Sequence, residues 1–125
     1  MLSKMKKLIF LITSVFILSS CEQDDFGPAQ IRVMNSSDTD FAEVIVNIAG
    51  TDHNYSELNS GEVSDYITFE KAYRYAYIEV STGDQDFVLQ PVDYVGETPL
   101  SEGKYTYDLD LLDGQSLTLT LIKDK

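Results

Sequence analysis

Acid–base chemistry at neutral pH would depend on very few residues of this chain. Its one histidine, His53, lies in the polar stretch TDHNYS, and catalysis near neutral pH usually needs a tuned base or an activated nucleophile. The turn-forming neighbours predict a solvent-exposed loop histidine instead. The sequence also contains no G-x-S-x-G elbow, no glycine-rich phosphate loop and no H-E-x-x-H motif. We therefore expect no catalytic residues and no cofactor.

Paired carboxylates are a second possible source of chemistry, because they can serve glycoside hydrolysis or bind Ca²⁺. Such pairs occur at Asp38 with Asp40 and at Asp84 with Asp86, both in predicted turns. In a chain with 21 acidic residues these pairs arise by chance. Neither run has the length or the glycine placement of an EF-hand loop. We expect no metal site.

The lone cysteine, Cys21, follows a leader typical of a signal peptide. Lys4, Lys6 and Lys7 precede a run of eleven uncharged residues, 8–18. A helix that spans a bilayer needs roughly 20 apolar residues, so this run is too short to be a transmembrane anchor. With no second cysteine, the chain can form neither a disulfide framework nor a thiolate metal cluster.

The residues that end the leader, Leu18, Ser19, Ser20 and Cys21, resemble the lipobox of bacterial lipoproteins. The resemblance implies removal of residues 1–20, diacylglycerol on the Cys21 sulfur and usually a further acyl chain on its amine. Two or more acyl chains hold a protein stably on a membrane. The alternative is an ordinary secretory signal with an accidental cysteine. We expect Cys21 to be lipidated, so that the membrane is a partner through this lipid.

The acidic residues after the cysteine resemble the export signal of surface-exposed lipoproteins in Bacteroidota-type bacteria. They are Glu22, Gln23, Asp24 and Asp25, followed by Phe26. The resemblance implies a position on the outer face of the outer membrane. The alternative is a solvated acidic linker. In either case residues 21–29 form a short tether, and residues 30–125 form the folded domain.

The charge of the mature chain excludes some partners. Of nine Lys and Arg, three lie in the leader, which leaves six against 21 acids and a net charge of −15. Phosphate backbones are bound through Lys and Arg, so we expect no nucleic acid partner.

From residue 30 onward the hydrophobic pattern has a period of two and is interrupted by turn residues, which predicts strands. The predicted strands are 31–35, 43–49, 63–69, 74–81, 86–92, 104–111 and 116–122. Seven short strands indicate an all-β fold, a single antiparallel β-sandwich. Three strands alternate apolar with polar residues and supply the predicted core faces: Val44, Val46 and Ile48; Tyr105, Tyr107, Leu109 and Leu111; Leu117, Leu119 and Leu121.

The stretch LSEGKYTYDL, residues 100–109, resembles the corner before a late strand of immunoglobulin-like and prealbumin-like domains. The resemblance implies that Tyr105 buries its ring and returns its hydroxyl to nearby backbone.

The mature chain also resembles small uncharacterised lipoproteins of the same bacteria, around YRYAY and PVDYVGETPL. That family implies no activity.

A row of tyrosines suggests a binding surface. In KAYRYAYIEV, Tyr73, Tyr75 and Tyr77 share one face of the predicted strand, while Ala76, Ile78 and Val80 share the other. If the aliphatic face is inward, the tyrosines form an exposed ridge that can bind a sugar or an extended peptide. The alternative is that they belong to the core or pair across strands with Tyr105 and Tyr107. Tyr94, in the loop 90–100, is a further candidate ligand-binding residue; the alternative is that this loop packs across the open end of the sandwich.

We thus expect a non-enzymatic, surface-anchored lipoprotein that binds a glycan or a protein of the cell envelope. A structural accessory subunit that docks a larger outer-membrane complex through a sheet edge or the tyrosines is the alternative. A small enzyme is the least favoured interpretation.

Overall fold

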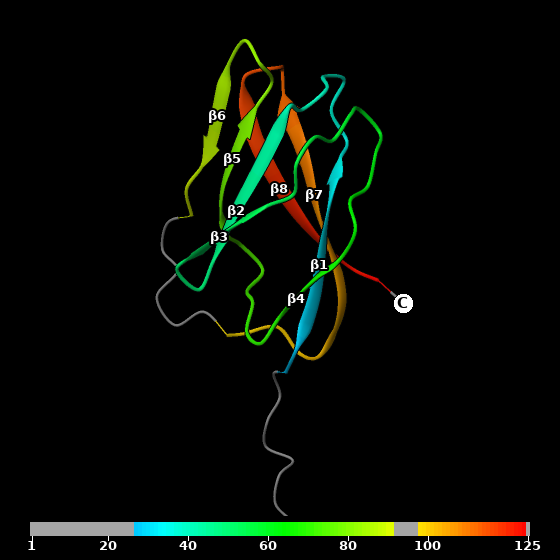
Figure 1. The fold of residues 1–125 in the computed structure, drawn as a ribbon, viewed down its shortest axis with the longest axis vertical. Coiled ribbons are helices and arrows are strands. Elements are labelled where there is room, and N and C mark those ends of the chain that lie inside the picture. The colour runs from blue at the N-terminus through cyan, green and yellow to red at the C-terminus, as the bar shows by residue number, and fades with distance from the viewer. Residues whose placement is uncertain (1–26, 92–97, 125) are drawn as a thin grey trace, which may run out of the picture.

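The structure, a computed structural model, describes residues 27–91 and 98–124. These residues form eight strands in two four-stranded sheets (Figure 1). Within this part of the chain no helix is long and apolar enough to cross a membrane. The predicted signal peptide, Cys21, the acidic residues Glu22 to Asp25 and the loop residue Tyr94 lie outside the described residues.

The first sheet has the strand order β4-β1-β7-β8. Its strands are β1 (Ala29–Asn35), β4 (Ile67–Phe69), β7 (Gly103–Leu112) and β8 (Ser116–Lys123). β1 pairs with β7 in parallel, over all seven of its residues, so the prediction of a purely antiparallel sandwich was wrong at this one ladder. A parallel pair cannot be closed by a hairpin. Here the whole of the second sheet lies between the two strands in sequence.

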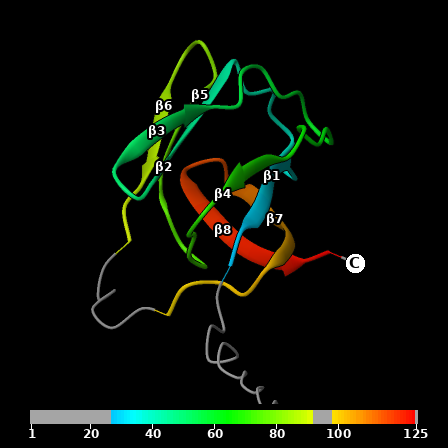
Figure 2. The ribbon, with the colours of Figure 1, turned by 60° about the horizontal axis from the view of Figure 1, so that its bottom comes forward.

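The second sheet has the order β3-β2-β5-β6 and is antiparallel throughout. It consists of β2 (Glu43–Ile48), β3 (Thr51–Asn54), β5 (Tyr77–Ser81) and β6 (Asp86–Leu89), and it faces the first sheet (Figure 2). β3 was not predicted. A two-residue hairpin turn places it, with φ of 55° at Ala49 and 83° at Gly50, as in the type I′ turns that match strand twist.

Two predicted strands are shorter than expected. β4 begins at Ile67 instead of residue 63, although Val63 still forms an isolated bridge to Met34. β5 begins at Tyr77 instead of residue 74. The backbone just before it bonds elsewhere, because the carbonyl of Ala72 accepts the amide of Leu100 and the carbonyl of Tyr73 accepts the hydroxyl of Tyr107. Residues 72 and 73 are thereby held away from a β5 ladder.

The core lies between the sheets and follows most of the predicted faces. Val44, Val46 and Ile48 of β2, and Tyr105, Tyr107 and Leu109 of β7, are all buried. Burial is weaker along β8, where Leu117 is buried but Leu119 and Leu121 are only partly so, as is Leu111 at the end of β7. β8 is the outer strand of its sheet. The inward face of the sandwich is therefore open to solvent along this strand.

The predicted tyrosine corner is present. The side chain of Tyr105 is 3% exposed, and its hydroxyl donates to the carbonyl oxygen of Ser101 at 2.8 Å. The bond fixes the approach to β7 from the preceding loop. The ring is then held in the core while its polar tip remains satisfied.

Candidate binding site

The three candidate tyrosines are neither a buried row nor a regular exposed ridge. Tyr75 is 47% exposed, whereas Tyr73 and Tyr77 are half-buried. Only Tyr77 belongs to a strand, so the even spacing expected of an extended strand does not hold for the other two. The aliphatic residues behave as expected for the core face, because Ala76, Ile78 and Val80 are all buried. Tyr75 is therefore the candidate that solvent reaches most freely.

Tyr75 borders an apolar crevice of about 450 Å³ on the side of the sandwich where the outer strands β6 and β8 lie. Leu89, Gln90 and Pro91 at the end of β6 line one part of it. Leu117, Thr118 and Leu119 of β8 line the other part. The crevice thus joins the open edges of the two sheets, with an aromatic ring at its mouth.

A second cleft of about 220 Å³ continues along β8. Its lining residues are Arg74, Tyr75, Leu119, Thr120 and Leu121. Tyr75 and Leu119 line both clefts. The two clefts therefore form one groove that follows β8 from Leu117 to Leu121. We call it the β8 groove. The part beside Leu117 is apolar, and Arg74 supplies a positive charge at the end beside Leu121.

The remaining tyrosines lie on a smaller hollow next to the β2–β3 turn. Tyr73, Tyr75 and Tyr77 line this hollow of about 160 Å³ together with residues 47–50. The hydroxyl of Tyr77 donates to Oε2 of Glu79 at 2.8 Å, and this hydrogen bond to a carboxylate raises the pKa of the phenol. Tyr75 consequently lies between this hollow and the β8 groove, and it contributes to both.

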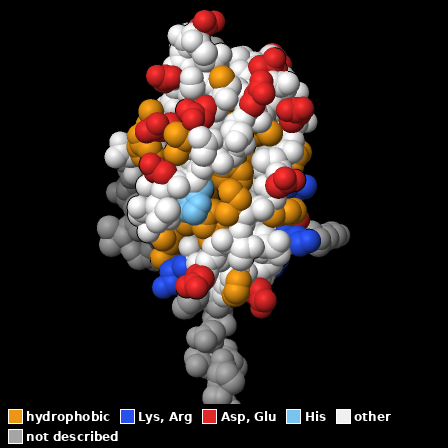
Figure 3. All heavy atoms as spheres, in the orientation of Figure 1, with side chains coloured by type: hydrophobic (Ala, Val, Ile, Leu, Met, Phe, Trp, Pro, Cys, Tyr) orange, Lys and Arg blue, Asp and Glu red, His pale blue; other side chains and the backbone are white. Residues whose placement is uncertain are grey.

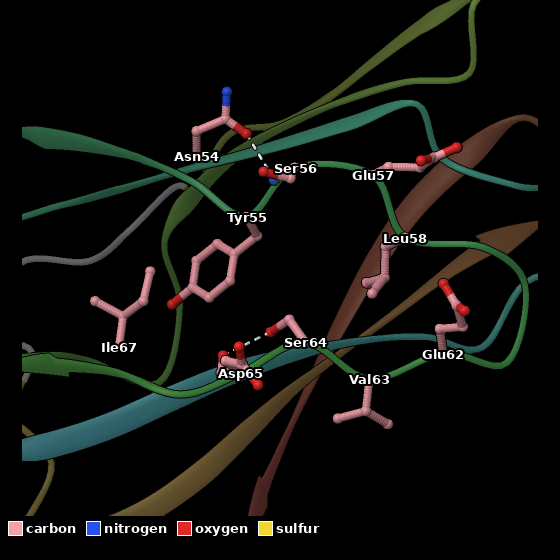
Figure 4. A pocket seen from close by; sticks show the side chains of 10 residues that line it. All are labelled: Asn54, Tyr55, Ser56, Glu57, Leu58, Glu62, Val63, Ser64, Asp65 and Ile67. Carbon is pink, nitrogen blue, oxygen red and sulfur yellow. Dashed lines mark hydrogen bonds between the residues drawn. The ribbon is translucent and has the colours of Figure 1, made fainter.

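A separate cleft of about 510 Å³ lies on the opposite side of the sandwich, around residues 54–67 (Figure 4). Its lining is mainly polar and includes the acids Glu57, Glu62 and Asp65. The Tyr55 side chain points into it, but the hydroxyl already donates to the carbonyl of Ile31 at 3.0 Å, and burial raises the pKa of the phenol. The hydroxyl of Tyr55 is thus committed to holding the fold.

The position of His53 differs from the predicted solvated loop. His53 lies in β3, is half-buried, and packs edge-on against Phe69 of β4, with ring centroids 4.6 Å apart. Sequence reasoning missed this because the polar stretch TDHN has no strand pattern. The contact links the outer strands of the two sheets on this side.

The paired acids lie on the surface of the domain. Among the described residues, no group of three or more His, Cys, Asp and Glu side chains is placed to hold a metal ion. Asp38, Asp40, Asp84 and Asp86 are exposed, and Asp40 accepts the amide of Ser60 at 2.9 Å. On the face shown in Figure 3 the acidic side chains lie mainly toward one end, away from the start of the described chain.

The most connected charged cluster surrounds Asp124 on the outer face of the first sheet. Its carboxylate accepts the hydroxyls of Tyr66 at 2.6 Å and Thr106 at 2.8 Å, and it lies 3.5 Å from Nε of Arg32. Burial alone would raise the pKa of Asp124, but these hydrogen bonds and the charges of Arg32 and Lys104 together lower it. The cluster is internally satisfied and fastens the end of the chain.

Comparisons with known proteins identify no family. No protein-family model matches the chain, and no curated protein matches it. A solved structure described as the NMR structure of a protein from Eubacterium rectale is similar over 86% of this chain and 96% of that chain. The identity is 13% and the TM-score 0.46.

Proposed function

We propose that this chain is a lipoprotein that binds a protein or a glycan of the cell envelope and catalyses no reaction. Lipid on Cys21 would hold it at the outer face of the outer membrane. The lipobox-like LSSC and the acidic residues Glu22 to Asp25 support this location. Only residues 26–28 separate Asp25 from β1, so the folded domain would stand close to the membrane.

One observation carries the binding proposal: Tyr75 is 47% exposed and borders three hollows of the surface. An aromatic ring at such a position offers a large flat apolar surface at little entropic cost, together with a polar tip. Residues of this kind are enriched among those that dominate binding energy. Tyr75, flanked by Tyr73 and Tyr77, is the proposed centre of the binding surface.

We further propose that the sandwich is prealbumin-like. Immunoglobulin domains of the constant type combine a four-stranded with a three-stranded sheet, and those of the variable type have nine strands. Two four-stranded sheets favour the prealbumin-like alternative. The hydrogen bond of Tyr105 to the corner before β7 agrees with either type.

The lipid anchor is tested by Cys21→Ser in the native host. The wild-type chain is expected to partition into the detergent phase of a whole-cell extract and to incorporate labelled palmitate. The variant loses the acceptor sulfur, so it should incorporate no label and lose membrane attachment. Retention of label in the variant would contradict lipidation at this residue.

The binding surface is tested by Tyr75→Ala. Panels of envelope glycans and envelope proteins are screened against the wild-type chain, and affinities are then compared between variants. Loss of a central aromatic anchor costs about 2 kcal/mol or more, or roughly 30-fold in affinity. Leu112→Ala is the control, since Leu112 is 62% exposed but lines none of the three hollows. Equal affinity of the two variants would place the binding surface elsewhere.

A role as an accessory subunit is the second candidate. The observation that favours it is the outer strand β8, eight residues long and without a neighbour on one side among the described residues. Such a strand can dock another chain by its backbone.

A further inference from the structure

We propose that the free edge of β8 binds an extended polypeptide segment of a partner protein. The segment would join the first sheet as a fifth strand, fill the β8 groove with apolar side chains and place a carboxylate at Arg74. This inference rests on the proposed binding function and names the class of its ligand.

The hydrogen-bonding groups at this edge can be assigned from the register of β7 and β8. The amide of Asp124 donates to the carbonyl of Lys104 at 2.8 Å, and Tyr105 faces Lys123 in the next pair. Hydrogen-bonded and non-hydrogen-bonded pairs alternate along an antiparallel ladder. The even-numbered residues of β8 therefore bond to β7. The N–H and C=O groups of Leu117, Leu119, Leu121 and Lys123 point away from it, toward the free edge.

The same residues form the floor of the β8 groove. Leu117, Leu119 and Leu121 turn their side chains toward the inside of the sandwich, but of the three only Leu117 is buried. Leu109, which faces Leu119 across the ladder, is 0% exposed. Burial thus falls from Leu109 on β7 to Leu119 on β8. One added strand beyond β8 would cover the part of Leu119 that solvent still reaches. Its own apolar side chains, at every second residue, would meet Tyr75 and Leu89.

Within the described residues, the edge has few of the devices that usually prevent strand addition. Outer strands are commonly blocked by proline, by a bulge, by inward-pointing charge or by a covering segment. β8 contains no proline, pairs without interruption with β7, and has a single charge, Lys123, at its last position. Eight residues in this state form a long regular edge. Its regular spacing of donors and acceptors suits a peptide backbone better than a sugar ring.

Charge indicates what the added segment carries. The Arg74 guanidinium lines the groove beside Leu121 and makes no hydrogen bond or ion pair within residues 27–91 and 98–124. A carboxylate, from Asp, Glu or the end of a chain, is the natural partner of such a group. A second copy fits less well, because each mature chain would bring a net charge of −15 to the contact.

The first test measures amide hydrogen exchange in the full chain, in detergent micelles without a partner. The amides of Thr118 and Thr120 are expected to exchange slowly, and those of Leu119 and Leu121 nearly as fast as in an unfolded peptide. Slow exchange of all four at every protein concentration would overturn the proposal, because the edge would already be covered. Protection that grows with protein concentration would also overturn it, in favour of a second copy.

The second test selects ligands from a library of random twelve-residue peptides displayed with free C-termini. Enriched peptides are expected to carry apolar residues at every second position and an acidic group, and to slow the exchange of the Leu119 and Leu121 amides. Arg74→Glu should lower the affinity for these peptides by roughly tenfold or more. Lys71→Glu, the same change of charge at a residue that does not line the groove, should leave the affinity unchanged.

N-methylation of a selected peptide separates strand addition from other modes of binding. Methyl groups on one set of alternate amides should abolish binding, whereas methyl groups on the other set should have little effect, because only one set faces β8. Equal effects of both sets, or no enrichment of alternating peptides, would overturn the proposal. If an envelope protein or glycan still requires Tyr75 in that case, the proposed binding function stands without strand addition.

Discussion

The buried side chain of Asn35 gives the most exacting test of the fold. At 0% exposure it makes four hydrogen bonds. Its Nδ2 donates to the carbonyls of Thr39 and Leu58 at 2.8 and 2.9 Å. Its Oδ1 accepts the amide and the hydroxyl of Ser37 at 2.9 and 2.7 Å. One amide group thus holds the loop after β1 against residue 58.

Asn35→Asp preserves the shape of the side chain but removes the donor of two of these four hydrogen bonds. An oxygen replaces Nδ2 and faces two carbonyl oxygens, and two hydrogen bonds of about 1 kcal/mol each are lost. An uncompensated buried charge costs several kcal/mol more. We expect a loss of about 4 kcal/mol in the free energy of unfolding at pH 7, which lowers the Tm by roughly 15 °C or more.

The loss should depend on pH in a defined direction. Burial and the two carbonyls raise the folded-state pKa of the introduced carboxyl above its unfolded value of about 3.9. The stability that protonation of this carboxyl restores to the variant is therefore fully present below the unfolded pKa. It is lost as pH rises through the folded pKa. Because the protonated acid also restores one donor, the deficit relative to wild type should shrink to about 2 kcal/mol near pH 4.

Thermal unfolding of the full chain in nonionic detergent, followed by circular dichroism at pH 4.5 and pH 7, measures both effects. Asn59→Asp is the control, since Asn59 is exposed and its side chain makes no hydrogen bond among those found in the described residues. The control should change stability by no more than about 0.5 kcal/mol. A deficit for Asn35→Asp that is as small as this, or that is the same at both pH values, would refute the reasoning.

Two further predictions concern polar contacts of the first sheet. Tyr105→Phe keeps the buried ring but removes the 2.8 Å bond to Ser101, so urea unfolding should show a loss of about 1 kcal/mol; unchanged stability would mean that the corner bond contributes nothing. Asp124→Asn should lower the stability most near neutral pH, because a carboxylate whose folded pKa is lowered stabilises above its unfolded pKa and loses this effect as pH falls through the folded pKa. Urea midpoints of wild type and variant should therefore converge below pH about 4, and a constant difference down to pH 2 would contradict the contribution of this carboxylate.

Much of the sandwich could be predicted from local pattern alone. Strands with clean alternation, such as β2 and β7, were found within one residue at each end, and Tyr105 behaves as its motif implied. The polar strand β3 was not found, because Ala49 and Gly50 set its direction and its own residues show no apolar period. The predicted start of β5 was too early, because Leu100 and Tyr107 form hydrogen bonds with the backbone that precedes the strand.

The candidate site could be predicted only in part. The tyrosine stretch drew attention to Tyr75, but the openness of β8 depends on the order of strands in the sheets, and periodicity carries no information on that order. Leu119 and Leu121 were accordingly expected in the core. Neighbouring residues of a strand point to opposite faces, whereas Arg74 and Tyr75 line the same groove. Only the folded arrangement brings these residues together.

The parallel pairing of β1 with β7 also has a mechanical consequence. β1 is the strand nearest to the proposed lipid anchor, and it lies inside its sheet between β4 and β7. A pull on the tether, as from a large partner in flow, would act along β1 and load its hydrogen bonds to β7 in shear. All seven residues of that ladder would then resist together instead of opening one pair at a time. The anchoring point is thus coupled to a part of the sandwich suited to bear tension.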